Sequence, residues 1–440
     1  MEQLLKERFG MSWELICDQN QLILKLLGQP GSVVFDHLEP VFMQTGQQQV
    51  LGCEWWPVEH PWQSVLGASH LPAPSRRPLR QPLIELDEEA VTCHYDILSL
   101  AFWTMNRLEE VGAISLDKHQ RFQAGQSHAV QHEYLDRPLV DEWLHLLGQI
   151  IQVQWPQIEL KKHRFQLLLS HDVDRPSRYG FRSLKGLVRA VGGDVLRQGD
   201  IRSLWIAPWV RLNTKQQLHP FDTFNTFNWI MEQSERAGVK STFNFICDTK
   251  FGPYEPDYNL DHPAIRHLIR EIYQRGHLIG LHPSYESYLK PQKICDEFQR
   301  LMRVCEEEGV EQSLWGGRMH YLQWSQPETI SAWDDAGLDY DSTLGFAERA
   351  GFRCGTCFGY RVYDTKKELT LGVIEKPLIA MEASVLSQKY MGVEDLEKAM
   401  KIFDSLKLKC KKVGGEFGLL WHNSELTTPS LKALYSKAIQ

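Results

Sequence analysis

An apolar run leads directly into two acidic residues in the segment Leu167-Leu-Leu-Ser-His-Asp-Val-Asp174. Three successive leucines are typical of a β-strand that is buried on both faces, as in a parallel α/β sheet. Proteins of this kind build their sites where the strands end, which is where Asp172 and Asp174 stand. Because these acids are two residues apart, an extended backbone directs both carboxylates to one side. The segment predicts an α/β core with an acidic site at a strand end, and the alternative is a plain strand followed by a polar turn.

Four later segments repeat this arrangement, in which a short strand ends in residues that bind metals or move protons. They deliver His282 after His277–Leu281, Arg318 and His320 after Gly316-Gly317, Asp341-Ser342 after Leu338–Tyr340, and His422 after Glu416–Trp421. Helical patterns that stop at glycines alternate with these strands. The alternation predicts a ring of strand ends around one site.

In this order the segments resemble the motifs of the polysaccharide deacetylases, the NodB-homology family of carbohydrate esterases. The five motifs are matched by Ser170–Asp174, Gly276–His282, Arg318–Tyr321, Asp341-Ser342 and Leu420–His422. The resemblance covers about residues 164–425 and extends to deacetylase-like proteins from bacterial surface-polysaccharide loci. It implies a distorted (β/α) barrel, similar to a TIM barrel, that belongs to a divergent branch of the family.

The resemblance also implies a role for each motif residue. Asp172 takes the position of the catalytic base, and Arg318 that of the residue that orients it. Asp174 and His282 take metal-ligand positions, and His422 takes that of the general acid. The chemistry agrees, because amide hydrolysis needs an activated water and a proton for the departing amine.

Two residues depart from the family pattern. Glu286 stands where a second histidine is usual, and it either ligates the metal through oxygen or faces solvent. His320 replaces a usual proline, and it either completes the metal shell or hydrogen-bonds a sugar. We expect a divalent metal, with zinc first and cobalt, manganese or iron as alternatives. Three aromatic residues near these motifs either stack on sugar faces or fill the core: Tyr285, Tyr321 and Trp324.

The chain of 440 residues is longer than one typical domain. We expect an additional N-terminal α/β domain over residues 1–160 and a catalytic barrel over 161–440. Residues 175–215 read as an insertion after the first motif, rich in arginine and containing Trp205 and Trp209. This insertion either flanks an anionic or lipid-linked glycan or is a helical excursion on the surface.

The charge and cysteine content limit the partners. A net charge of −8 and a pI of about 6.1 argue against a broad nucleic-acid-binding surface. No export signal or membrane-spanning stretch is recognisable, and the scattered cysteines suit reducing conditions. A cytoplasmic protein is expected, and its oligomeric state stays open.

The expected function is a metal-dependent hydrolase that removes N-acetyl groups from a sugar unit of a bacterial surface glycan or its precursor. One alternative is a carbohydrate-binding pseudoenzyme that lost the metal, because Glu286 stands where a histidine is usual. A second is a glycoside hydrolase, which needs two acids on opposite sides of a bond. That geometry is disfavoured because Asp172 and Asp174 share one strand end.

Overall fold

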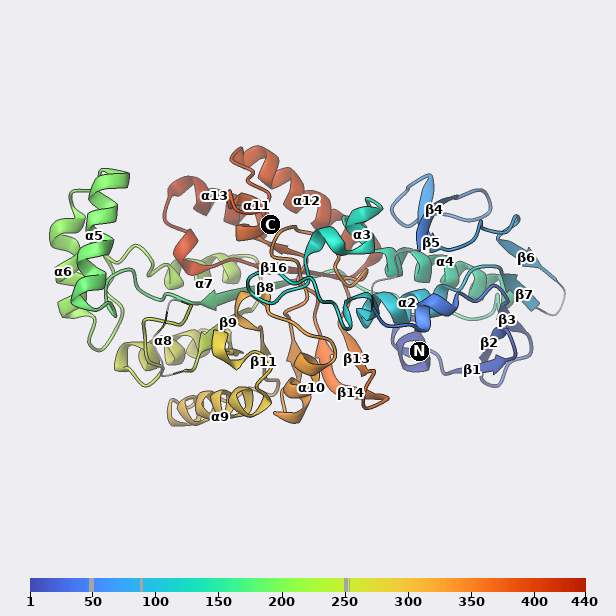
Figure 1. Cartoon of the computed structure of the whole chain (residues 1–440), viewed down its shortest axis with the longest axis horizontal. Coiled ribbons are helices and arrows are strands. Elements are labelled where there is room, and N and C mark those ends of the chain that lie inside the picture. The colour runs from blue at the N-terminus through green and yellow to red at the C-terminus, as the bar shows by residue number, and fades with distance from the viewer. Residues whose placement is uncertain (47–50, 88–89, 249–251, 253) are drawn as a thin grey trace.

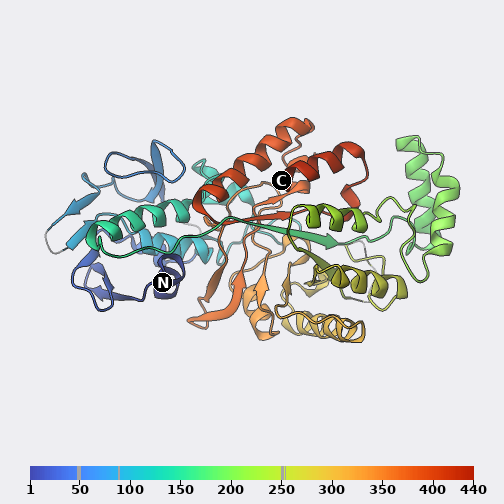
Figure 2. The same ribbon diagram turned by 180° about the vertical axis from the view of Figure 1, so that it is seen from behind.

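The computed structural model describes residues 1–46, 51–87, 90–248, 252 and 254–440. The protein is elongated, with a large sheet and its helices in the middle (Figure 1). A smaller N-terminal sheet lies at one end and a pair of helices at the other, and the view from behind shows the same order (Figure 2). The predicted mixed α/β class is confirmed.

The large sheet of the described residues has nine strands in the order β13-β14-β12-β11-β10-β9-β8-β16-β15. Only the β13–β14 pair is antiparallel. The bounds in sheet order are Tyr360–Asp364, Leu369–Glu375, Tyr340–Asp341, Gly316–Gly317, Leu278–His282, Ser241–Ile246, Gln166–Val173, Glu416–Leu420 and Ala380–Met381. The motif-bearing strands β12, β11, β10, β8 and β16 are therefore consecutive except for β9 and run in one direction, which brings their carboxyl ends to one edge.

No strand pair closes this sheet into a barrel within the described part of the chain. Residues 376–379, which run from β14 to β15, instead span the gap between the two ends of the strand order. The Leu378 amide donates to the Leu344 carbonyl, and the Ile379 amide donates to the Gly418 carbonyl. In the described residues the structure thus shows an open sheet bridged by an irregular segment, and the expected (β/α) barrel stays a prediction.

Amphipathic helices cover this sheet. They are α7 (Phe227–Arg236), α8 (Pro263–Gln274), α9 (Pro291–Glu307), α10 (Glu328–Asp335), α11 (Glu382–Leu386), α12 (Leu396–Val413) and α13 (Pro429–Ala438). In α8, Pro263 occupies the first turn, where its missing N–H costs nothing. Ile265, Leu268 and Ile272 are buried at helical spacing. Gly276 then adopts φ +81°, which ends the helix and starts β10.

The N-terminal region holds a five-stranded sheet and a two-stranded sheet. The first is β1 (Trp13–Asp18), β2 (Gln21–Leu26), β3 (Ser32–Phe35), β7 (Ala90–Cys93) and β6 (Ile84–Leu86), and the second is β4 (Gly52–Pro57) and β5 (His70–Ser75). The helices are α1 (Glu2–Phe9), α2 (Ile97–Met105), α3 (His128–Gln131) and α4 (Leu139–Gln154). A domain boundary near residue 160 stays a prediction.

A buried ionic network joins this region to the large sheet. Glu110 accepts from Arg107 at 2.8 Å and from Arg353 at 2.5 Å, and all three side chains are buried. The Tyr360 hydroxyl also donates to the Met105 carbonyl at 2.6 Å. Charges removed from water in this way stabilise a fold only while they remain paired.

The predicted insertion forms two helices, α5 (Leu184–Gln198) and α6 (Ser203–Asn213). They pack on each other through Leu187, Ala207 and Val210, which are buried. In Figure 1 this hairpin stands at the end of the molecule opposite the N-terminal sheet.

Candidate metal centre

Three side chains with metal-binding atoms converge at the carboxyl ends of the strands. Asp174 follows β8, His282 ends β10, and His320 begins a short turn after β11. Asp174 Oδ1 lies 3.2 Å from His282 Nε2 and 3.5 Å from His320 Nε2. One ligand atom from each residue lies within 4.8 Å of the other two. These atoms are spaced as ligands around a single cation would be.

The protonation states of this cluster suit a divalent cation. Asp174 Oδ1 is buried and makes no hydrogen bond with any described residue. Burial lowers the pKa of His320 to about 4, so its imidazole is neutral at pH 7. Burial lowers the pKa of His282, but Asp172 and Asp174 raise it above its usual value, and its Nδ1 donates to the Arg318 carbonyl at 2.6 Å. A cation bound at Nε2, which faces Asp174, would therefore replace a proton there. One carboxylate and two imidazoles are a donor set for zinc or another first-row divalent metal.

Asp172 lies beside this cluster and is held by two donors. Arg318 Nη1 donates to Asp172 Oδ1 at 3.0 Å, and Asn244 Nδ2 donates to the same oxygen at 2.7 Å. Burial alone would raise the pKa of Asp172, but the opposing charges of Arg318 and His282 hold it below its usual value. Asp172 is therefore an ionised carboxylate, and its Oδ2 lies 3.9 Å from His282 Nε2.

His422 also lies beside the cluster. Its Nε2 lies 3.7 Å from Asp174 Oδ2, while its Nδ1 donates to Glu382 Oε1 at 2.5 Å. Burial would lower the pKa of His422, but Glu382 offsets this and raises it to about 10. The ring is thus a protonated imidazolium, oriented by a buried carboxylate that also accepts the His422 amide.

Glu286 is not brought to this cluster. The side chain is 58% exposed and pairs with Lys290 at 3.2 Å. A spacing of four residues makes side chains neighbours on an α-helix, but Pro283 and a short 3-10 turn (Tyr285–Ser287) follow His282 here. His320 is the third member of the candidate cluster instead, and its role as a metal ligand stays a prediction.

Of the three aromatic residues predicted near the motifs, one lies in the hydrophobic core and two belong to an aromatic cluster beside a pocket. Trp324 is 3% exposed and belongs to the hydrophobic core. Tyr321 and Tyr254 line a pocket of about 240 Å³ that also contains Asp174, His320 and His422. Tyr285 stacks on Tyr254 with ring centroids 4.7 Å apart. The pocket thus has one aromatic wall directly beside the candidate metal ligands.

The N-terminal region supports this wall. Arg121 Nη1 donates to the Tyr321 carbonyl at 2.8 Å, and Asp117 holds the guanidinium with a hydrogen bond to Nε at 2.9 Å. Tyr321 and Leu322 have φ angles of +59° and +56°, a left-handed conformation that side chains rarely adopt. The Arg121 contact therefore fixes a strained turn that begins at His320.

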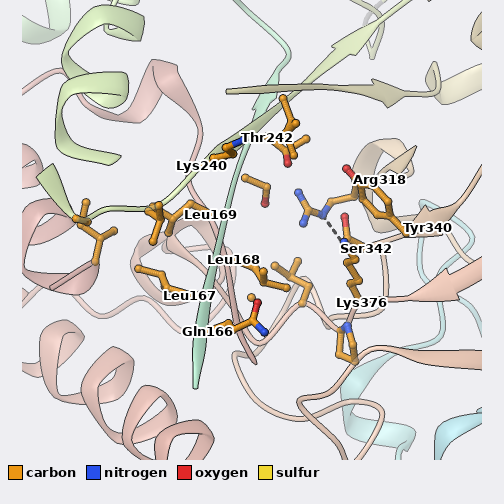
Figure 3. A pocket seen from close by; sticks show the side chains of 18 of the residues that line it. Gln166, Leu167, Leu168, Leu169, Lys240, Thr242, Arg318, Tyr340, Ser342 and Lys376 are labelled. Atoms are coloured by element: carbon orange, nitrogen blue, oxygen red, sulfur yellow. Dashed lines mark hydrogen bonds between the residues drawn. The ribbon is translucent and has the colours of Figure 1, made fainter. Parts of the chain in front are cut away.

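A second, larger cavity lies behind the layer of Asp172, Arg318 and Asn244. Its volume is about 600 Å³, and it opens between the starts of the strands, near Gln166 and Lys240. Figure 3 shows Arg318 among its lining residues, with Nε bound to the Ser342 carbonyl. None of the three candidate metal ligands lines this cavity. The smaller pocket, which contains Asp174 and His320, is therefore the candidate site.

Asn244 and Glu382 are site residues that the motifs did not indicate. Asn244 had a signal, since it is a polar residue inside the apolar strand Ser241–Ile246 and faces Asp172 across the β8–β9 register. Glu382 had none, because it lies 40 positions before His422 in the chain.

Comparisons with known proteins find one family model and several solved structures of low sequence identity. Residues 1–156 match a family of unknown function, DUF7033. No curated protein matches the chain. A solved structure assigned as a polysaccharide deacetylase, from Mycobacterium smegmatis, is 16% identical, with a TM-score of 0.39 over 63% of this chain and 84% of that one.

Two further solved structures show similar values. PuuE allantoinase is 14% identical, with a TM-score of 0.38 over 65% of this chain and 85% of that one. A polysaccharide deacetylase from Bacillus cereus is 11% identical, with a TM-score of 0.29 over 63% and 86%. These scores are below 0.5, so the functional argument rests on the site geometry.

Proposed function

We propose that this protein is a metal-dependent hydrolase that removes an N-acetyl group from a sugar unit of a bacterial surface glycan or of its precursor. The observation that carries the proposal is the convergence of Asp174, His282 and His320 next to one group that can accept a proton and one group that can donate a proton. Asp172 next to this cluster is an ionised carboxylate, and His422 next to it is an imidazolium. An amide hydrolase needs this pairing of a base and an acid across one carbonyl.

A divalent cation held by Asp174, His282 and His320 supplies the Lewis acidity that polarises the acetyl carbonyl and lowers the pKa of water. Asp172 accepts the proton of the attacking water, and Arg318 and Asn244 keep its free oxygen directed at the site. His422 donates its Nε2 proton to the departing sugar nitrogen, and Glu382 steadies the ring through Nδ1. Tyr321 and Tyr254 offer ring faces to the sugar.

The test is acetate release from N-acetylated oligosaccharides by purified protein supplied with zinc. Asp172→Asn and His422→Ala should each lower turnover about 10²–10⁴-fold, because each removes one proton-transfer partner. Glu286→Ala is the matched control, since it removes an acid that is exposed and distant from the cluster.

Three results would overturn the proposal. Full activity of both Asp172→Asn and His422→Ala, at unchanged unfolding temperature, removes the assigned roles. Release of reducing ends without acetate points to glycosidic cleavage instead. A protein that takes up no zinc at any ratio is a binding protein rather than this hydrolase.

A further inference from the structure

Helix α6 carries two apolar faces, and only one of them is covered. Ala207 and Val210 are buried against α5. The other face consists of large apolar residues that are each 51–63% exposed, namely Leu204, Trp205, Trp209 and Leu212, together with Ile201 just before the helix begins. Their spacing of three and four residues places them on one stripe of the helix. We call this stripe the α6 face.

Helix α5 adds further exposed apolar side chains to the hairpin. Leu184, Val188 and Leu196 are 70%, 73% and 86% exposed. Eight of the twenty large apolar side chains that are exposed in the described part of the chain therefore lie within residues 184–212. An apolar concentration of this kind on a globular protein marks an interaction site.

The hairpin is basic although the chain is acidic. Residues 182–215 contain seven Lys or Arg and two Asp, while the whole chain has a net charge of −8. Asp194 is buried and bonded to Arg178 and Tyr179, so it does not offset this charge at the surface. Lys185 and Arg189 are exposed and make no ion pair with any described residue.

The hairpin projects from the body while its root is fixed beside the candidate metal centre. Both views show α5 and α6 at one end of the molecule, beyond the helices that cover the sheet (Figures 1 and 2). Asn423, which follows His422, donates to the Arg175 carbonyl at 3.0 Å. Ser177 donates to Asp222 at 2.6 Å. A surface bound by the hairpin would therefore be held near the pocket.

We propose that the hairpin docks on the surface of an anionic lipid bilayer, with the α6 face in the headgroup region. Exposed tryptophans favour that region because one part of the ring is apolar and its N–H is polar. Unpaired basic side chains are attracted to anionic headgroups, and a helix with both features lies on a membrane. No helix of the described chain is long and apolar enough to span a bilayer, so docking at the surface is the geometry that fits.

The experiment is co-sedimentation of the full-length protein with vesicles of phosphatidylcholine that contain phosphatidylglycerol, and with phosphatidylcholine alone. The protein should bind the anionic vesicles, and added salt should weaken binding. The variant Trp205→Ser/Trp209→Ser should lose more than about tenfold in affinity per tryptophan. Lys185→Gln/Arg189→Gln should lose about 25-fold, since each basic residue near an anionic surface contributes about fivefold.

Leu314→Ser/Leu408→Ser is the matched control, because these residues are 54% and 53% exposed outside the hairpin. It should bind vesicles as the wild type does, and every variant should keep the wild-type unfolding temperature. Failure of the wild type to bind, or undiminished binding by the tryptophan variant, overturns the proposal. A dimer in sedimentation velocity that Trp205→Ser/Trp209→Ser converts to monomer overturns it in favour of contact between two copies of the chain.

Discussion

Substitution of Gly280 tests the site without replacing any residue that is proposed to take part in catalysis. It lies in β10 beside Asn244 of β9, and the two residues are paired in register. A Cβ atom at position 280 would lie 2.1 Å from Asn244 Oδ1. A carbon and an oxygen normally approach to about 3.3 Å, so Gly280→Ala should displace the Asn244 amide by about 1 Å.

The displacement has a predictable cost. Asn244 Nδ2 donates to Asp172 at 2.7 Å, and a hydrogen bond to a charged group contributes about 1.5–3 kcal/mol. Misplacement of a catalytic group by about 1 Å costs up to about 100-fold in rate. We expect Gly280→Ala to lower kcat about 10–100-fold, while KM changes little because the pocket wall is untouched.

The assay is acetate release, accompanied by zinc stoichiometry and thermal unfolding. Gly193→Ala is the matched control, since a Cβ there meets nothing within 4 Å. Asn244→Ala should reproduce the loss without any crowding. Wild-type kcat in Gly280→Ala, with the fold retained, would refute the reasoning that Asn244 holds Asp172 in its working position.

Three more outcomes follow from the contacts. His320→Ala should weaken zinc affinity more than about 100-fold in a chelator competition. Groups outside the ligand shell already contribute about 10–100-fold, so loss of a ligand should cost more. Equal zinc affinities of His320→Ala and Glu286→Ala would contradict the ligand set. Burial raises the pKa of Glu297 from 4.5 to about 7, so the protonated carboxyl stabilises the fold fully below about pH 4.5, and about 3 kcal/mol is lost as pH rises through 7. Denaturant unfolding of Glu297→Gln should lack this loss between pH 5 and 8, and an unchanged pH dependence would argue against the buried carboxyl as its source. Arg121→Ala should reduce zinc affinity about tenfold by freeing the turn at Tyr321, whereas unaltered affinity would make Arg121 a purely structural residue.

Residues that follow a strand were predictable from the sequence. Asp172, Asp174 and His282 are each preceded by an apolar run, and parallel strands bring their ends together. The third ligand was left open between Glu286 and His320. Spacing along a chain reports distance only inside a regular helix or strand, and neither residue lies in one.

Residues that reach the site from elsewhere in the chain were not predictable. Glu382 meets His422 because β15 and β16 are paired, and Arg121 meets Tyr321 across 200 positions. The bridge across the open side of the sheet was also beyond the sequence pattern. It depends on two backbone hydrogen bonds of residues 376–379, and no side-chain periodicity encodes them.

The ionic network at Glu110 predicts how removal of the N-terminal region would affect the stability of the rest of the chain. A fragment that starts at residue 161 would keep Arg353 in the interior without the carboxylate that neutralises it, and an orphaned internal charge typically costs about 3–5 kcal/mol. The same cut would remove Arg121 from the turn beside His320. A shortened protein is therefore expected to be less stable and to bind zinc more weakly, so residues 1–160 should contribute both to the stability of the remaining chain and to the proposed metal site.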